Sequence, residues 1–243
     1  MWYIVCLIVL IFVYVLAITF MDRFKRPWLV NLILIGVCLS CYVALAIIIY
    51  KDVGFWDWNF QNALPTANVS PFMFCSLALY VFFLPKKIRK YHSVLIALLS
   101  AGMFGAVAIA CVSRAVIRYK FHFSFVLDYL SHLSLSLFGI YLVRSEQVEL
   151  KKRDCLIAGG ALFSVAVIML IINAIFGTAY FGLALNEKYN IYNMVLAPNA
   201  YLSAALYFVC LVLVLTIGYF YVKFLTAINS KTHEESSENK AVD

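Results

Sequence analysis

The chain has 243 residues, of which 65% are hydrophobic and 13% charged, and its mean hydropathy is +0.94. This composition excludes an ordinary soluble domain, in which about 25% of residues are charged. The formal net charge is +7, but no soluble segment interleaves basic and aromatic side chains, so we expect anionic lipid headgroups and no nucleic acid as partners.

Seven apolar runs predict an all-α polytopic membrane protein, because each approaches the ~20 residues that cross a hydrocarbon core. They cover residues 1–20, 28–50, 70–85, 93–113, 124–143, 155–176 and 200–226. We therefore expect one seven-helix transmembrane domain over 1–226. The first run has no positive charge before it, which favours a retained helix over a secretory signal. Residues 227–243 are polar and mixed in charge, which predicts a disordered cytoplasmic tail.

The basic residues predict an orientation for this bundle. Fourteen of the nineteen Lys and Arg residues follow the first, third, fifth and seventh runs. Since cytoplasmic loops carry an excess of Lys and Arg, we expect the N-terminus outside and the C-terminus in the cytoplasm. The third run is the shortest of the seven. Gly102, Gly105, Gly159 and Gly160 are expected to allow close packing between helices.

Four polar residues inside these runs indicate a candidate site. Cys75, Asp128, His132 and Asn173 all fall in the outer leaflet when the chain is threaded in this orientation. Asp128 and His132 lie about 6 and 12 Å below Ser124 at 1.5 Å per residue. Ionisable residues are costly inside a membrane and usually face a protein interior or a water-filled cavity. We therefore treat the four as a functional cluster.

The residue types in this cluster favour acyl chemistry. Asp128 and His132 are four residues apart, so the carboxylate can orient the imidazole. The imidazole can then act as general base for Cys75, whose thiolate attacks an ester. Substrate or oxyanion contacts are expected from the polar side chains near the outer boundary, Asn173, Thr178, Tyr180 and Arg114. This chemistry requires no cofactor, and the cysteines show no metal-binding spacing.

Several alternatives remain open for the same residues. Asp128 can simply neutralise Arg114 or Arg118, and His132 can make a structural interhelical hydrogen bond. A transporter or small-molecule-binding protein would use Asp128, His132 and Arg114 to hold a polar solute or carry protons. In a non-catalytic scaffold subunit the same cluster would be structural. A reactive thiol at Cys75 is expected of the enzyme alone.

Three segments resemble a known family. The stretch Pro71-Phe-Met-Phe-Cys75-Ser, the His132 helix and the segment from Asn173 to Tyr180 resemble the YwaF-like bacterial integral membrane proteins. That family is distantly similar to eukaryotic membrane acyltransferases of ether-phospholipid remodelling and to androgen-induced membrane hydrolases of fatty-acid esters.

The resemblance implies particular roles for two residues. In the acyltransferase branch a Cys nucleophile is followed by a His at about the spacing of Cys75 and His132, which are 57 residues apart. It also implies a membrane lipid substrate and a place in the bacterial cell membrane. The chain departs from the family pattern at Met73, where a polar residue is common, and at Ala179, which interrupts a GTNY motif.

Overall fold

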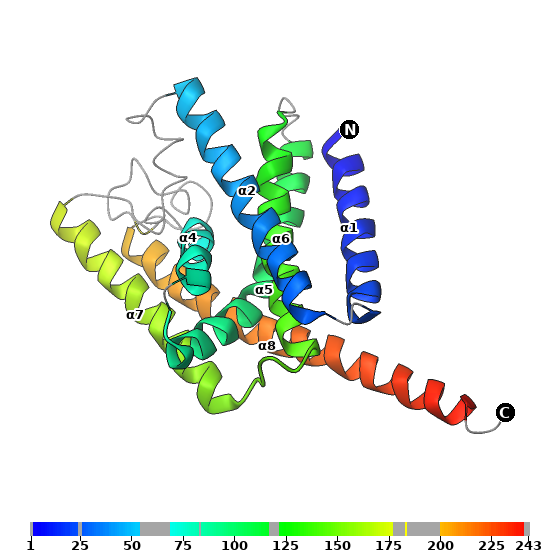
Figure 1. The fold of residues 1–243 in the computed structure, drawn as a ribbon. Helices are drawn as coiled ribbons and strands as arrows, with labels where there is room; N and C mark the ends of the chain where they lie inside the picture. The colour runs from blue at the N-terminus through cyan, green and yellow to red at the C-terminus, as the bar shows by residue number, and fades with distance from the viewer. Residues whose placement is uncertain are drawn as a thin grey trace.

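A computed structural model describes residues 2–23, 26–53, 69–82, 84–116, 122–176, 183 and 200–240. All regular secondary structure among these residues is helical, as the composition predicts (Figure 1). The elements in chain order are α1 (Trp2–Phe20), the short 3₁₀ helix η1 (Met21–Arg23), α2 (Pro27–Val53), α4 (Val69–Phe82), α5 (Lys86–Val116), α6 (Ser124–Arg144), α7 (Lys152–Phe176) and α8 (Ala200–Lys240).

Six of the described helices are long and apolar enough to cross a membrane, which confirms the helical membrane character of the chain. The third predicted span differs from the others. Its helix α4 has 14 residues, which rise about 21 Å, whereas a hydrocarbon core is about 30 Å thick. The structure therefore describes six full-length candidate spans and one short apolar helix, α4, at the run that is also the shortest in the sequence.

Helices α5 and α6 form the centre of the bundle. Residues 93–100 of α5 and 133–142 of α6 are buried without interruption, so these segments are covered on every side. Both segments are mainly apolar, with a few buried serines, as expected for helices inside a bundle. By contrast, α1 buries only a stripe containing Tyr3, Leu10 and Tyr14 and exposes most of its other apolar side chains.

Two glycines allow the central helices to approach closely. A Cβ atom on Gly139 of α6 would lie 2.7 Å from the carbonyl oxygen of Ile96, and one on Gly218 of α8 would collide with the carbonyl of Leu98. The sequence analysis instead named Gly102, Gly105, Gly159 and Gly160. Of these, a Cβ on Gly102 would lie 2.5 Å from Val214. Nothing lies within 4 Å of a Cβ on Gly105 or Gly160, so neither mediates close packing.

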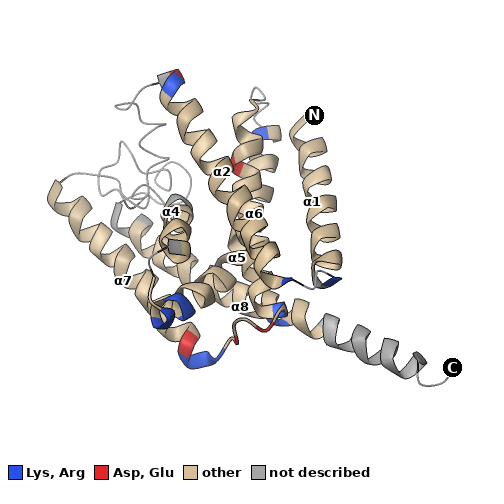
Figure 2. Ribbon diagram, in the orientation of Figure 1, with Lys and Arg blue, Asp and Glu red and all other residues tan. Residues whose placement is uncertain are grey.

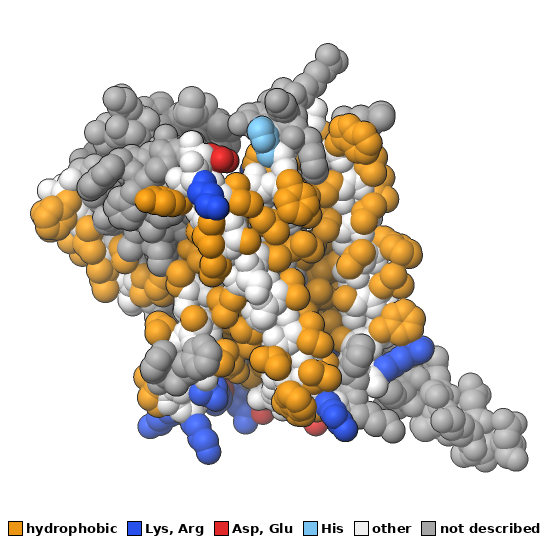
Figure 3. Space-filling view, turned by 45° about the horizontal axis from the view of Figure 1, so that its top comes forward, with side chains coloured by type: hydrophobic (Ala, Val, Ile, Leu, Met, Phe, Trp, Pro, Cys, Tyr) orange, Lys and Arg blue, Asp and Glu red, His pale blue; other side chains and the backbone are white. Residues whose placement is uncertain are grey.

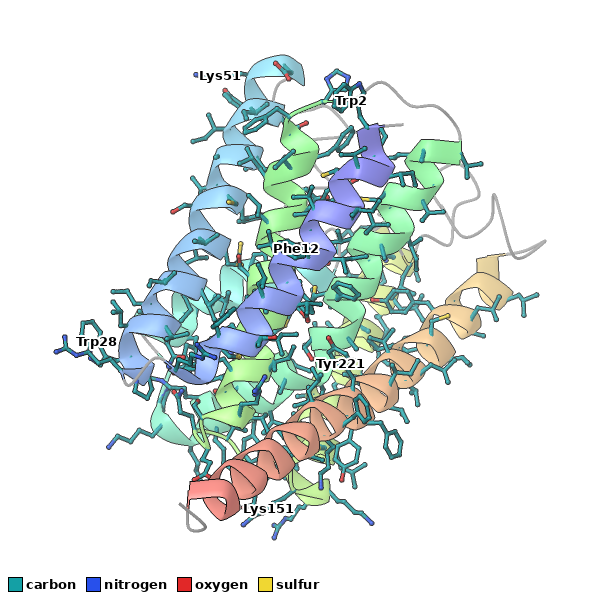
Figure 4. All side chains as sticks on the ribbon, turned by 90° about the vertical axis from the view of Figure 1, so that its right-hand side faces the viewer. Trp2, Phe12, Trp28, Lys51, Lys151 and Tyr221 are labelled. Atoms are coloured by element: carbon teal, nitrogen blue, oxygen red, sulfur yellow. The ribbon has the colours of Figure 1, made fainter. Side chains whose placement is uncertain are left out.

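The described charges lie at the two ends of the bundle, and apolar side chains cover its middle (Figures 2 and 3). Most of the blue residues in Figure 2 gather at the end opposite the N-terminus. Trp2 and Lys51 lie at one end of the molecule, whereas Trp28 and Lys151 lie at the other (Figure 4). Trp2 and Trp28 are 69% and 62% exposed, which suits an aromatic belt at each membrane surface. Trp-rich residues 54–68 lie outside the described residues.

Helix α8 continues beyond the apolar pattern. The helix begins at Ala200 and its backbone is helical through Lys240, which lies within the predicted polar tail. Residues 219–243 contain no Gly or Pro, and Lys, Glu and Ala in this segment favour helix. The apolar part of α8 packs against α5, and its polar extension projects from the bundle (Figure 1).

Candidate functional site

Asp128 and His132 form a pair on the first two turns of α6. The Nδ1 atom of His132 lies 2.8 Å from the backbone oxygen of Asp128 and 3.3 Å from its carboxylate oxygen Oδ1. Since both neighbours are acceptors, Nδ1 carries the proton and donates it. In neutral imidazole the lone pair is then on Nε2, the arrangement that a general base requires. The side chain of Asp128 is 30% exposed and that of His132 is 12% exposed.

Arg114 approaches this pair from the last turn of α5. Its guanidinium donates a 2.5 Å hydrogen bond to the hydroxyl of Tyr129 and lies 3.9 Å from the centre of the Phe125 ring. The positive charge of Arg114 also interacts electrostatically with Asp128 and with His132. Within the described residues Arg114 and Asp128 form no salt bridge, so the carboxylate is paired with His132 instead. Arg118 lies outside these residues.

Cys75 lies on α4 and is half-buried. Its thiol donates to the hydroxyl of Tyr42 on α2, with sulfur and oxygen 3.7 Å apart. In the described part of the chain Cys75 makes no hydrogen bond to His132. All seven cysteines of the chain are free thiols. The sequence analysis did not find Tyr42, because a tyrosine in an apolar run resembles many packing residues.

Phe74 connects the thiol to the acid–base pair. Its side chain is 1% exposed. The Phe74 ring meets the His132 ring edge to face with centroids 5.1 Å apart, and it meets the Tyr42 ring at 5.2 Å. Successive residues of a helix point about 100° apart. Phe74 therefore faces α6 while Cys75 faces α2. The His132 imidazole contacts the Phe74 ring, and the Cys75 thiol contacts Tyr42, whose ring also meets Phe74.

Helix α4 is also held by a polar contact that the sequence analysis missed. The Ser76 hydroxyl donates to the carbonyl of Met73 at 2.8 Å, and its oxygen lies 2.6 Å from Nε2 of His92 on α5. Because Ser76 has one proton to donate, His92 is the donor in the second bond. The His92 ring also stacks on Tyr80 at 5.4 Å. A histidine at the end of an apolar run was the signal available in the sequence.

Among the remaining predicted site residues that the structure describes, Asn173 contacts a different segment from the pair on α6. Asn173 of α7 is 2% exposed and donates from its side-chain amide to the carbonyl of Leu183 at 3.2 Å. Its helix packs mainly against α5, and to a lesser extent against α8. Thr178 and Tyr180 lie outside the described residues. Among the serines of α6, Ser131 donates to the Asp128 carbonyl of its own helix, whereas Ser136 donates to the Ser100 carbonyl of α5.

The described site is suited to proton transfer and anion binding. It offers a base at Nε2 of His132, a carboxylate that orients the ring, a cation at Arg114, and a thiol in a neighbouring contact. No group of three or more metal-ligating side chains occurs in the described ranges. The arrangement therefore provides acid–base and nucleophilic groups from the protein itself.

Comparison with known proteins supports the membrane assignment. The family model that matches the chain is that of the TMEM164 family, over residues 1–222. No curated protein and no solved structure matches the chain. The matched range contains every residue of the candidate site. Together with the six long apolar helices, the match makes this chain an integral membrane protein.

Proposed function

Because the chain belongs to the TMEM164 family of membrane proteins, we propose that it is a membrane enzyme that transfers or hydrolyses a lipid acyl group. Cys75 is the nucleophile, His132 the general base and then acid, and Asp128 the group that orients the imidazole. The substrate is an acyl ester of a membrane lipid. The observation that carries the proposal is the Nδ1 contact of His132 with Asp128, which leaves Nε2 as the basic atom.

The proposed reaction has two steps. Nε2 of His132 accepts the thiol proton of Cys75, and the thiolate sulfur attacks the ester carbonyl. The carbon–oxygen ester bond breaks, the leaving alkoxide takes the proton from His132, and an acyl thioester remains on Cys75. In the second step His132 deprotonates an acceptor hydroxyl or water, which attacks the thioester and restores the thiol. Transfer and hydrolysis differ only in that acceptor.

The reaction requires a local rearrangement around Phe74. In the structure the Cys75 thiol contacts Tyr42, and the Phe74 ring occupies the face of α4 toward His132. The thiol must leave Tyr42 and turn toward Nε2 when substrate binds. Catalytic hydrogen bonds commonly form only in the substrate complex. Arg114 supplies a fixed cation for a lipid headgroup near the same end of α6.

The test is acyl capture by purified protein. Wild-type protein, Cys75→Ser and His132→Ala are incubated with an alkyne-tagged acyl phospholipid, and the tag is quantified on the Cys75 peptide. We expect a hydroxylamine-sensitive thioester in wild type and none in Cys75→Ser. In His132→Ala the rate should fall by about 10²–10⁴-fold. His122→Ala, which removes an exposed imidazole, is the matched control. Equal labelling in both site variants would rule out the mechanism.

A second function is favoured by the independence of the polar cluster from Cys75. Asp128, His132 and Arg114 are brought together by α5 and α6 alone. A transporter or a small-molecule-binding protein could use these three groups to bind a polar solute. If the protein binds a solute, Cys75→Ser should retain solute binding and Asp128→Asn should lose it. If the protein is the acyl-transfer enzyme, both variants should lose acyl transfer. In a structural scaffold the wild-type protein would show neither solute binding nor acyl labelling.

The proposal also includes a topology. The end of the bundle that carries Trp2, Lys51 and the site is placed outside the cell, and the basic end faces the cytoplasm. The site then opens to the outer leaflet of a bacterial cell membrane. Cysteine substitutions at Lys51 and Lys151 test this directly: a membrane-impermeant maleimide should label the first and not the second in intact cells. The reverse pattern contradicts the topology.

A further inference from the structure

A groove runs between α7 and α8 at the end of the bundle away from Asp128 and His132. Its volume is about 550 Å³ and Leu98 of α5 contributes to its lining. Gly159 and Gly160 line the α7 side, and a Cβ on Gly160 would meet nothing within 4 Å. Gly160 therefore leaves a space between the helices, whereas a Cβ on Gly159 would lie 3.3 Å from the side chain of Leu215.

The two ends of the groove differ in chemistry. At one end the rings of Phe163 and Phe208 meet across α7 and α8 with centroids 4.7 Å apart. At the other end lies Lys152, the first residue of α7. Lys223 of α8 is outside the lining but lies beside Tyr219, which lines the groove. The hydroxyl of Thr216, which also lines the groove, bonds to its own helix at Val212. The walls are thus apolar between an aromatic end and a basic end.

The two lysines are available to bind an anion. Their neighbours are paired: Lys90 forms a 2.7 Å ion pair with Asp154, and Lys151 one of 2.9 Å with Glu149. Within the part of the chain that the structure describes, Lys152 and Lys223 have no carboxylate partner. Lys223 lies over the ring of Tyr219 at 5.3 Å. Among the described residues, the basic end therefore has one lysine without an ion pair in its lining, Lys152, and a second, Lys223, beside it.

The length of the groove matches one leaflet of a bilayer. Lys152 and Phe163 are eleven residues apart on α7, which corresponds to roughly 16 Å of helix. A hydrocarbon core is about 30 Å thick, so one leaflet occupies about half of it. The groove is thus about as long as one leaflet is thick, with Lys152 at one end and the two rings at the other.

We propose that this groove binds one phospholipid of the basic-end leaflet, with an acyl chain along Gly159 and Gly160 and the phosphate between Lys152 and Lys223. A phospholipid combines the apolar chain and the anion that the two parts of the groove require. The site does not depend on acyl chemistry at Cys75, because no residue of α4 lines it. It holds a lipid in the leaflet opposite the candidate catalytic cluster.

The test uses a photoactivatable phosphatidylglycerol with a diazirine in one acyl chain, reconstituted with the purified protein in nanodiscs. Crosslinked peptides should come from both α7 and α8, between residues 155–163 and 212–220. Gly160→Trp fills the groove and should lower crosslinking by about tenfold. Lys152→Glu and Lys223→Glu should each lower it by about fivefold. Gly36→Trp, at another glycine with open space around its Cβ, should leave it unchanged.

Three outcomes would overturn the proposal. Crosslinking that is equal in wild type and all groove variants would show only unspecific boundary lipid. Equal capture of a diazirine diacylglycerol, which lacks the phosphate, would remove the role of the lysines. Disulfide formation between Cys155 residues of two chains under oxidation would place a second copy in the groove. Size-exclusion profiles and thermal unfolding of each variant identify any variant that fails to fold. If Gly160→Trp fails to fold, Lys152→Glu and Lys223→Glu still test the proposal.

Discussion

The imidazole of His132 and the ring of Phe74 meet at 88°, with centroids 5.1 Å apart. Phe74 immediately precedes Cys75 on α4, so the proposed nucleophile and base belong to helices that touch through this ring. The contact also fixes the rotation of α4 about its axis. With Phe74 against α6, Cys75 is turned toward Tyr42 of α2. In the proposed mechanism, activation of the Cys75 thiol therefore depends on the position of the buried Phe74 ring.

Asp128→Asn should inactivate the imidazole without removing it. The amide can still meet Nδ1 of His132, but it can also donate a hydrogen, which favours the tautomer with the proton on Nε2. We expect acyl transfer to slow by about 10²–10⁴-fold while the protein remains folded. The rate of Cys75 acylation measures this. Asp52→Asn, at an exposed carboxylate near the end of α2, serves as control. Unchanged acylation in Asp128→Asn would remove Asp128 from the mechanism.

Tyr42→Phe tests the only hydrogen bond that the described structure shows for Cys75. The substitution keeps the ring that packs on Phe74 and deletes only the hydroxyl. When the thiol ionises, the same hydroxyl can turn and donate to the sulfur, and a hydrogen bond to a charged group contributes about 1.5–3 kcal/mol. We expect iodoacetamide to modify Cys75 at least several-fold more slowly in this variant. Peptides containing Cys6 and Cys155 provide internal references, and faster modification of Cys75 contradicts the assignment.

A buried polar network should contribute measurably to stability. The hydroxyl of Tyr14 lies 2.5 Å from Oγ of Ser136, which donates to the carbonyl of Ser100, and 3.1 Å from the hydroxyl of Tyr221. These bonds join α1, α5, α6 and α8. Ser136→Ala should lower the free energy of unfolding by about 0.6–1.7 kcal/mol. Denaturation in mixed micelles measures the change. Ser164→Ala, whose hydroxyl bonds within its own helix at Gly160, should cost less.

Gly218→Ala should destabilise the protein through steric overlap. The new methyl group would collide with the backbone of Leu98, which cannot move without shifting α5. Overpacking of this kind costs about 1–3 kcal/mol. Gly36→Ala provides the contrast, because its Cβ meets nothing within 4 Å and Ala favours helix over Gly by about 1 kcal/mol. Thermal unfolding of the two variants should therefore shift in opposite directions. An unchanged midpoint for Gly218→Ala would contradict the close approach of α8 and α5.

The helical class, the approximate spans and the Asp128–His132 pair follow from the sequence alone. Each depends on the chain's own periodicity: apolar runs long enough to cross a bilayer, and a spacing of four residues that stacks two side chains on a helix. The extent of α4 was less accessible. Its apolar run suggests a full span, but the helix ends at Phe82, shortly before Pro85.

Only the tertiary structure decided how the helices are rotated and which residues meet between them. The Cys75 thiol faces Tyr42, Ser76 meets His92, and Gly139 and Gly218, unlike Gly160, bring helices together. A membrane helix that is apolar on all sides carries no strong amphipathic signal of which face is buried. That choice is made by the packing of complete side chains from several helices at once. The sequence could therefore name the polar residues of the candidate site, but only packing determined their partners.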